Sequence, residues 1–531
     1  MSYVFKKLTA LTLCLCMLLG VCVTGASAGQ ASDTVTVSYQ ESLKNLEYDA
    51  PVILVEGMGG SFYKAMSTET PDDDVRIWGM PADLIVDVIF SNIGKLLIYL
   101  IINDYEAITE LLADVAGQLF GDFACDENGI PDPDTYIDRK SNYAFHDGTG
   151  YENAYVFVYD WRYDMSTIAA QLDEYIKYIM SMTGSDKVVL TSMSMGTAVL
   201  MTYLYEYYYN AEDYSESNHI EAVVFIAGAM NGVACCGDPF SGNIKADSTS
   251  LMRFLSEIMS GNPTTEAICK ILDLLYVAGA FDPAVNYVND LNQKLVENGF
   301  GNSVLDNIAT IPGFYALMSQ EEYAAAKALI FDTPEKQAKY AEIIRKSDYY
   351  HECVQANGTK IIQSLLDDGI NTAIIAEYGY TMMPLTSDGG RMSDGTILTA
   401  DESFGATCAE VDGTLGSGYV QAKKCSCGKS HVSADNQIDA STCAFPDITW
   451  FGKSLRHTCA EEYIADLVNL VAFSDEQINV WSYSDLPQFM VNIDGESLVP
   501  LTAENAAPVV PYEETVIFGK LKSKIKSVLG F

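Results

Sequence analysis

Basic residues are scarce in this chain of 531 residues, which holds 31 lysines and arginines against 72 aspartates and glutamates. The formal net charge is −41, and the acidic residues are spread along the whole length. Such a surface repels the phosphate backbone of nucleic acids and favours solubility. We therefore expect no nucleic-acid partner.

Internal repeats are also missing, and the main apolar stretch after the N-terminal region is not free of polar residues. This stretch, residues 82–102, is interrupted by Asp87, Asn92 and Lys95. Each of these side chains is costly in lipid. The stretch therefore predicts one or two buried or lid helices and not a membrane span.

The first residues have the pattern of an export signal. Lys6 and Lys7 precede a short apolar run that ends in an A-x-A site at residues 26–28. This pattern predicts a secretory signal peptide over residues 1–28, and hence a secreted or extracytoplasmic protein. Residues 29–48 are expected to form a polar leader.

Three of the 13 cysteines lie in the predicted signal peptide, which leaves ten, an even number that permits disulfides of undetermined pairing in an exported chain. One group, Cys425, Cys427, His431 and Cys443, has residue types that bind zinc. Its C-x-C step is tighter than the usual C-x₂₋₄-C pair. We therefore favour a local disulfide or free thiols there, and we predict no metal and no organic cofactor.

Apolar strand patterns alternate with helical patterns along most of the chain. This alternation indicates βαβ units and a mainly parallel sheet, which is an α/β fold. The segments expected to form strands lie within residues 50–63, 153–164, 186–196, 220–232 and 370–380.

We predict one large domain over residues 49–510. Helical insertions are expected at about 64–140 and 237–348, because these segments break the strand–helix rhythm. The second insertion is expected to form a cap over the strand ends.

The stretch LTSMSMGTAVL, residues 190–200, nearly matches the G-x-S-x-G nucleophile motif of serine hydrolases. Ser194 stands at the nucleophile position, with Ser192 in place of the first glycine and Gly196 as the second. A strand pattern precedes the turn and a helical pattern follows it, as the motif requires. The first position needs a small side chain, so Ser192 weakens the motif without breaking it. The alternative is a polar strand-to-helix turn without chemistry.

A hydrolytic serine also needs N–H donors for the oxyanion of the tetrahedral intermediate. The turn Gly57-Met58-Gly59-Gly60 follows the first apolar strand, where an oxyanion loop belongs. Gly57 would let the backbone turn, and we expect the N–H groups of Met58 and Met195 to be the two donors. An ordinary strand-ending turn is the alternative.

The acid of a hydrolase triad follows the nucleophile in the chain, and the histidine comes last. Asp394, in Ser393-Asp394-Gly395-Thr396, is the preferred acid, with Asp388 and Asp401 as rivals on the same loop. An Asp-Gly pair can also be no more than a turn.

Only five histidines are present, and chain order leaves His431 and His457 as candidates for the base. His457 is preferred because it lies in a loop just before an amphipathic helix, with apolar residues on both sides. His431 lies in a polar loop beside two cysteines.

Four motifs together resemble the lecithin:cholesterol acyltransferase-like lipases. They are the turn at residues 57–61, the Y-D-W-R strand end at 159–162, the elbow at 194–196 and the D-G-T loop at 394–396. The resemblance covers the core strands but neither insertion, and it implies an α/β-hydrolase fold and activity on carboxylic esters, often lipid-like ones. Glu56 replaces the family's proline in the turn, and Met193 replaces the usual histidine before the nucleophile.

These observations predict a secreted lipase or esterase with a Ser194, Asp394 and His457 triad and an ester or lipid substrate. An O-acyltransferase or phospholipase of the same fold, or a non-catalytic surface-binding protein on a hydrolase scaffold, remains open. The tail, residues 511–531, is the one basic amphipathic stretch. It suggests peripheral contact with a membrane or cell surface. The alternatives are a frayed tail or a helix docked on the acidic body.

Overall fold

The computed structural model describes residues 39–66, 74–78, 91–138, 154–211, 219–258, 263–387 and 389–506, apart from 93, 97, 280, 300, 302–306, 426, 458–460 and 494–497. The predicted signal peptide and basic tail lie outside these residues. The end of the predicted polar leader forms a short helix, α2 (Tyr39–Leu43).

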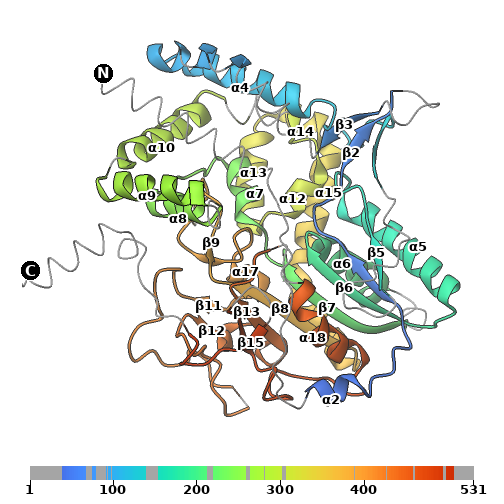
Figure 1. Cartoon of the computed structure of the whole chain (residues 1–531). Coiled ribbons are helices and arrows are strands. Elements are labelled where there is room, and N and C mark those ends of the chain that lie inside the picture. The colour runs from blue at the N-terminus through green and yellow to red at the C-terminus, as the bar shows by residue number, and fades with distance from the viewer. Residues whose placement is uncertain are drawn as a thin grey trace, which may run out of the picture.

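An eight-stranded sheet runs through the centre of the molecule in the order β15-β14-β13-β8-β7-β6-β1-β5 (Figure 1). All neighbours pair in parallel except β14 and β15. The strands are β1 (Val52–Val55), β5 (Ala154–Phe157), β6 (Val188–Ser194), β7 (Ile220–Gly228), β8 (Asn371–Tyr378), β13 (Thr449–Lys453), β14 (Phe489–Asn492) and β15 (Leu498–Pro500).

The five segments predicted to be strands form β1, β5, β6, β7 and β8, so the α/β class with a mainly parallel sheet is confirmed. Every residue of β8 is buried, as expected for a parallel strand that is covered on both faces. The sequence analysis missed β13, β14 and β15. These strands have three to five residues each, too few for a clear pattern.

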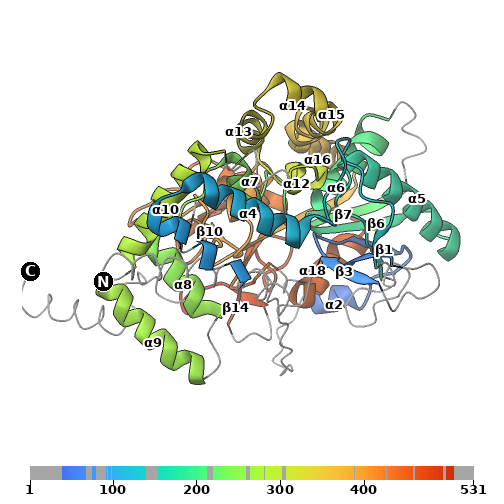
Figure 2. The same ribbon diagram turned by 90° about the horizontal axis from the view of Figure 1, so that it is seen from above.

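Helices cover the two faces of the sheet. Helices α5 (Met165–Thr183), α6 (Gly196–Leu204) and α16 (Gly358–Asp367) lie on one side, and α18 (Glu461–Phe473) lies with α2 on the other (Figure 2). Helix α5 begins at Asp164, whose side chain accepts a hydrogen bond from the N–H of Thr167, and ends at Gly184 in the left-handed conformation.

Between β7 and β8 the chain is helical. The helices are α7 (Ala234–Ser241), α8 (Ser248–Ile258), α9 (Pro263–Val277), α10 (Asp282–Glu297), α12 (Pro312–Ala316), α13 (Gln320–Ile330), α14 (Pro334–Lys339) and α15 (Ala341–Tyr349), followed by a π-helical turn (Tyr350–Val354) and a 3₁₀ turn (Gln355–Asn357). A second π-helical turn (Tyr205–Tyr209) continues α6.

The insertion predicted to be helical at about 64–140 is only partly so. It contains α4 (Tyr105–Phe120), which packs beside α10, but also β3 (Val75–Trp78) and β4 (Thr135–Ile137). These two strands flank β2 (Phe62–Lys64) in a small antiparallel sheet. In β4 the burial alternates from one residue to the next, which is the period of a strand and not of a helix.

The segment between β8 and β13 contains only short elements. They are β9 (Tyr380–Thr381), β10 (Met392–Ser393), α17 (Thr399–Glu402), β11 (Thr407–Cys408), β12 (Ile438–Asp439) and two 3₁₀ turns (Ala440–Thr442 and Pro446–Ile448). In the part of the chain that the structure describes, no single helix is long and apolar enough to cross a membrane, although one bent pair (Cys269–Val277 with Asp282–Glu297) passes by length and composition.

Candidate active site

Ser194 lies at a strained turn between β6 and α6. Its φ is +54°, a left-handed conformation that is costly for a residue with a side chain. The next glycine, Gly196, has no room for a Cβ atom, which would clash with the carbonyl oxygens of Val55 and Glu56. Helix α6 therefore starts directly against the end of β1. This tight turn leaves Ser194 at the carboxyl edge of the sheet.

Ser192, which replaces the first glycine of the motif, is fully buried in β6. Its hydroxyl lies 3.0 Å from that of Thr197 in the first turn of α6. The extra polar group is thus hydrogen-bonded inside the protein, so it does not carry the penalty of a buried unpaired hydroxyl. This contact explains how the elbow accommodates serine at a glycine position.

The glycine-rich turn after β1 lies against Ser194. A Cβ atom at Gly57 would sit 2.8 Å from the Cβ of Ser194, so only glycine lets the turn approach so closely. Gly60 has a φ of +82° and faces Ile137. Gly59, by contrast, has open space around it and no left-handed φ, so its identity has no steric reason here. Met58 lies within this turn, between Gly57 and Gly59.

Met195 is the N-cap residue of α6 and is fully buried. The first N–H groups of a helix have no acceptor within the helix and form a site for negative charge. The turn with Met58 lies against Ser194, and Met195 follows Ser194 at the N-terminus of α6, so both predicted oxyanion donors belong to segments next to the candidate nucleophile.

The Y-D-W-R segment after β5 holds this turn in place. The Tyr159 hydroxyl donates to the Glu56 carbonyl oxygen at 2.9 Å, and Trp161 Nε1 donates to the Gly59 carbonyl oxygen at 3.1 Å. Both side chains are almost fully buried. The sequence analysis noted the motif but not this role, which depends on the parallel pairing of β1 with β5.

His457 lies in the loop after β13 and faces Ser194. Its Nε2 atom is 2.8 Å from the Ser194 Oγ, and its Nδ1 atom is 2.5 Å from Asp394 Oδ2. The His457 backbone N–H also donates to the Asp394 carbonyl oxygen, at 3.3 Å. The side chain is 14% exposed, so only its edge is open to solvent.

The carboxylate of Asp394 is buried and fixed by its own loop. Its Oδ1 accepts the backbone N–H groups of Thr396 and Ile397, each at 2.7 Å. Gly395 has a φ of +101°, which makes glycine necessary for the turn that bends the loop back. Oδ2 therefore remains directed at His457 Nδ1.

The two ionisable groups shift each other's pKa. Burial alone would lower the pKa of His457, but the charge of Asp394 and its hydrogen bond raise it above the usual value. Burial would raise the pKa of Asp394, but the charge and hydrogen bond of His457, together with the Ile397 N–H, hold it below the usual value. Asp394 is thus ionised and stabilises a positive charge on the imidazole.

A second acid, Glu402 at the end of α17, lies buried close to Asp394. Burial, and then the charges of Asp394 and Glu377, raise the pKa of Glu402 well above its usual value. Glu402 is therefore protonated and neutral, and its Oε2 accepts the Glu377 N–H at 2.6 Å. The sequence analysis did not single out Glu402, and its only signal was an acid on the same loop.

The rival residues lie elsewhere or outside the described residues. Asp401 is on α17, and Asp388 is not among the residues described. His431 is buried beside Cys427. His351 is buried and bonds Gln355 and the Tyr315 carbonyl, and His219 bonds the Tyr203 hydroxyl. Among the described histidines, only His457 has a hydrogen bond to a serine at a left-handed turn.

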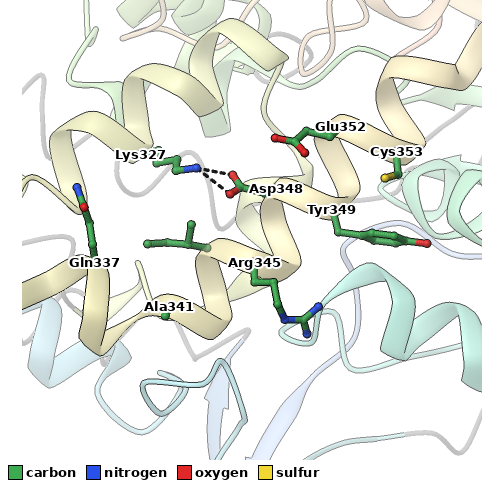
Figure 3. A pocket seen from close by; sticks show the side chains of 9 residues that line it. Lys327, Gln337, Ala341, Arg345, Asp348, Tyr349, Glu352 and Cys353 are labelled. Atoms are coloured by element: carbon green, nitrogen blue, oxygen red, sulfur yellow. Dashed lines mark hydrogen bonds and ion pairs between the residues drawn. The ribbon is translucent and has the colours of Figure 1, made fainter. Parts of the chain in front are cut away.

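A groove of about 570 Å³ lies apart from these residues, between α13, α14, α15 and the π-helical turn that follows (Figure 3). Lys327 pairs with Asp348 at one side of it. None of the nine residues that line the groove belongs to the Ser194 site. The groove therefore gives no information on the substrate of that site.

Seen as a whole, the site links a buried carboxylate, an imidazole and a serine hydroxyl through two hydrogen bonds. In this order the imidazole can accept the hydroxyl proton while the carboxylate stabilises the charge that forms. Comparisons of the chain with protein-family models and with curated proteins found no match.

Proposed function

We propose that this chain is a secreted serine hydrolase of the α/β-hydrolase fold that cleaves carboxylic esters, as a lipase or esterase. The observation that carries the proposal is the hydrogen-bonded series from Asp394 through His457 to Ser194. The motif resemblance to the lecithin:cholesterol acyltransferase-like lipases, and a parallel sheet that brings the three residues to one edge, support it.

The proposed reaction begins when His457 Nε2 takes the proton of the Ser194 hydroxyl as Oγ attacks the ester carbonyl carbon. The negative charge moves to the carbonyl oxygen, where the N–H groups of Met58 and Met195 would bind it. His457 then gives its proton to the departing alkoxide, and an acyl-Ser194 ester remains. Water, deprotonated by the same imidazole, releases the carboxylic acid and restores the hydroxyl.

Two other functions use the same scaffold. An alcohol or a lysophospholipid in place of water would make the protein an O-acyltransferase, and a phospholipid substrate would make it a phospholipase. A non-catalytic surface-binding protein is the alternative outside enzymes. We expect the wild-type chain to react with a fluorophosphonate probe and to hydrolyse p-nitrophenyl esters of graded chain length. Absence of both reactions would favour the binding protein, and a preference for long, aggregated esters would favour a lipase over an esterase.

The rate of ester cleavage is expected to fall at acidic pH, because the reaction requires neutral His457. The pKa of His457 is raised above the usual histidine value, so kcat/KM should drop as pH decreases through this raised pKa. The substitution Asp394→Asn removes the charge that raises this pKa. It should therefore move the midpoint to lower pH while reducing kcat by about 10⁴-fold.

The contribution of His457 to folding stability depends on pH in the opposite direction from the rate of ester cleavage. The protonated His457 and ionised Asp394 attract each other. This attraction contributes to the free energy of unfolding below the usual histidine pKa and is lost as pH rises through the raised pKa.

For the rate prediction, a pH–rate profile whose midpoint does not respond to Asp394→Asn would contradict the assigned His457–Asp394 pair.

Glu402 is expected to act as a positioning residue for Asp394. The variant Glu402→Gln keeps a neutral polar side chain that can still accept the Glu377 N–H, and it should retain most of the wild-type kcat. Glu402→Leu removes this acceptor, so the loop that carries Asp394 should hold His457 less well and kcat should fall about 10-fold or more, with a smaller change in KM. Steady-state kinetics on one ester, with circular dichroism to check folding, compares the two variants. Equal losses in both would mean that Glu402 acts only through packing.

A further inference from the structure

A second group of side chains with metal-binding chemistry lies outside the proposed active site. It consists of Cys425, Cys427, His431 and Asp447, and the ligand atoms of all four lie within 4.8 Å of one another. The sequence analysis had grouped the first three with Cys443 and favoured a disulfide or free thiols. In the structure the fourth member is Asp447, and none of the nine cysteines among the described residues forms a disulfide.

The distances within this cluster fit a tetrahedral ion. Cys427 Sγ is 3.3 Å from His431 Nε2, which is 3.7 Å from Asp447 Oδ1, and Cys425 Sγ is 3.8 Å from the same oxygen. Zinc binds sulfur at about 2.3 Å and nitrogen or oxygen at about 2.0–2.2 Å, which puts neighbouring ligand atoms about 3.3–3.8 Å apart in a tetrahedron. Only small side-chain shifts would be needed to close the four atoms around one ion.

The tautomer of His431 is set for metal binding. Gln488 Nε2 donates to the carbonyl oxygens of Pro446 and Thr449, at 2.7 and 3.0 Å, which fixes the orientation of its amide. Gln488 Oε1 then accepts from His431 Nδ1 at 2.8 Å. The proton is therefore on Nδ1, and the lone pair of Nε2 points into the cluster. A hydrogen bond on the far nitrogen is the usual support of a histidine ligand.

The two sulfur atoms and the carboxylate are also oriented by neighbours. The Cys427 N–H donates to Cys425 Sγ, and the Lys429 N–H donates to Cys427 Sγ, both at 3.3 Å. These hydrogen bonds hold both sulfur atoms beside the other two ligand atoms of the cluster. Trp481 Nε1 donates to Asp447 Oδ1 at 3.2 Å and holds that side chain toward the cluster.

We propose that Cys425, Cys427, His431 and Asp447 form a structural zinc site. Two thiolates, an imidazole and a carboxylate are soft and borderline donors, which favour zinc over magnesium or calcium, both of which prefer oxygen ligands only. Four protein ligands leave no open position for water or substrate, which indicates a structural and not a catalytic ion.

The site would join a long loop to the start of strand β13. The described residues of 409–437, between β11 and β12, contain no helix or strand and are largely polar. Asp447 lies in the 3₁₀ turn that leads directly into β13. A zinc ion would therefore fasten this long loop to the start of the strand that carries the His457 loop at its other end.

The test is the zinc content and zinc-dependent stability of the full chain with reduced thiols. We expect about one Zn²⁺ per wild-type chain by elemental analysis, and a lower unfolding temperature after treatment with a chelator. Cys427→Ser and Asp447→Ala should each lower zinc affinity by at least 10- to 100-fold. Cys443→Ala is the matched control, because Cys443 is a buried cysteine of the same region outside the cluster, and this variant should keep its zinc.

A measurement on the wild-type chain alone tests the proposal even if the variants do not fold. Co²⁺ added to the metal-free chain should give the intense thiolate-to-metal absorption and the visible bands of tetrahedral cobalt. The proposal is overturned if the reduced wild-type chain takes up neither ion. It is also overturned if Cys427→Ser and Asp447→Ala bind zinc as well as Cys443→Ala does. Because ester hydrolysis is not a readout, failure here would leave the proposed function unaffected.

Discussion

Replacing Ser194 by alanine is expected to abolish fluorophosphonate labelling and to reduce kcat for ester hydrolysis by about 10⁴- to 10⁶-fold. The loss is large because Oγ would form the covalent bond in the reaction, and no other group can replace it. Among the described residues, the Ser194 hydroxyl is the only one that forms a hydrogen bond with His457 Nε2. Intact-mass analysis after labelling, together with initial rates, measures both effects.

Ser192→Ala is the matched control for this result. Ser192 lies two residues earlier in β6, but its hydroxyl is directed at Thr197 and not at His457. The variant should lose some stability, because the Thr197 hydroxyl loses a buried partner, yet it should still be labelled. Labelling that persists in Ser194→Ala and disappears in Ser192→Ala would contradict the assignment of the nucleophile.

The second large effect is expected on stability. Asp160→Ala should lower the free energy of unfolding by about 3–5 kcal/mol, because it leaves a fully buried arginine without its counter-ion. Arg162 binds both carboxylate oxygens of Asp160, with Nε to Oδ1 at 2.9 Å and Nη2 to Oδ2 at 2.6 Å. The guanidinium also lies over the rings of Phe62 and Phe123, 4.9 and 5.0 Å from their centroids.

This pair joins the small antiparallel sheet to the main one. Arg162 Nη1 donates to the Thr135 hydroxyl in β4 at 2.9 Å, and Trp161, between the two ion-pair residues, donates to the Gly59 carbonyl oxygen in the glycine-rich turn after β1. Asp160→Ala should therefore also reduce activity. Denaturant titration measures the stability, with Glu342→Ala as the control, because its partner Arg345 is exposed and such pairs contribute little. Equal losses in the two variants would mean that the buried pair has no special role.

Much of the fold could be predicted from local patterns. Apolar runs bounded by turns form the strands β1, β5, β6, β7 and β8. The helices between them follow from the helical period of their apolar residues and from the capping residues at their ends. Short strands such as β13 could not be predicted, because a five-residue segment is a strand only through its pairing with β8 and β14. The strands beside α4 were missed for the same reason.

By itself, the sequence determined the α/β alternation, the strained turn at Ser194, and an order of residues in which an acid and a histidine follow the serine. Only the tertiary structure decided which of them meet. His457 is 263 residues from Ser194, and both lie at the carboxyl edge of one parallel sheet. His431 was an equal candidate by order, but its loop places it beside Asp447, at the opposite end of β13 from the His457 loop. Contacts of this range depend on strand order and register, which no local pattern contains.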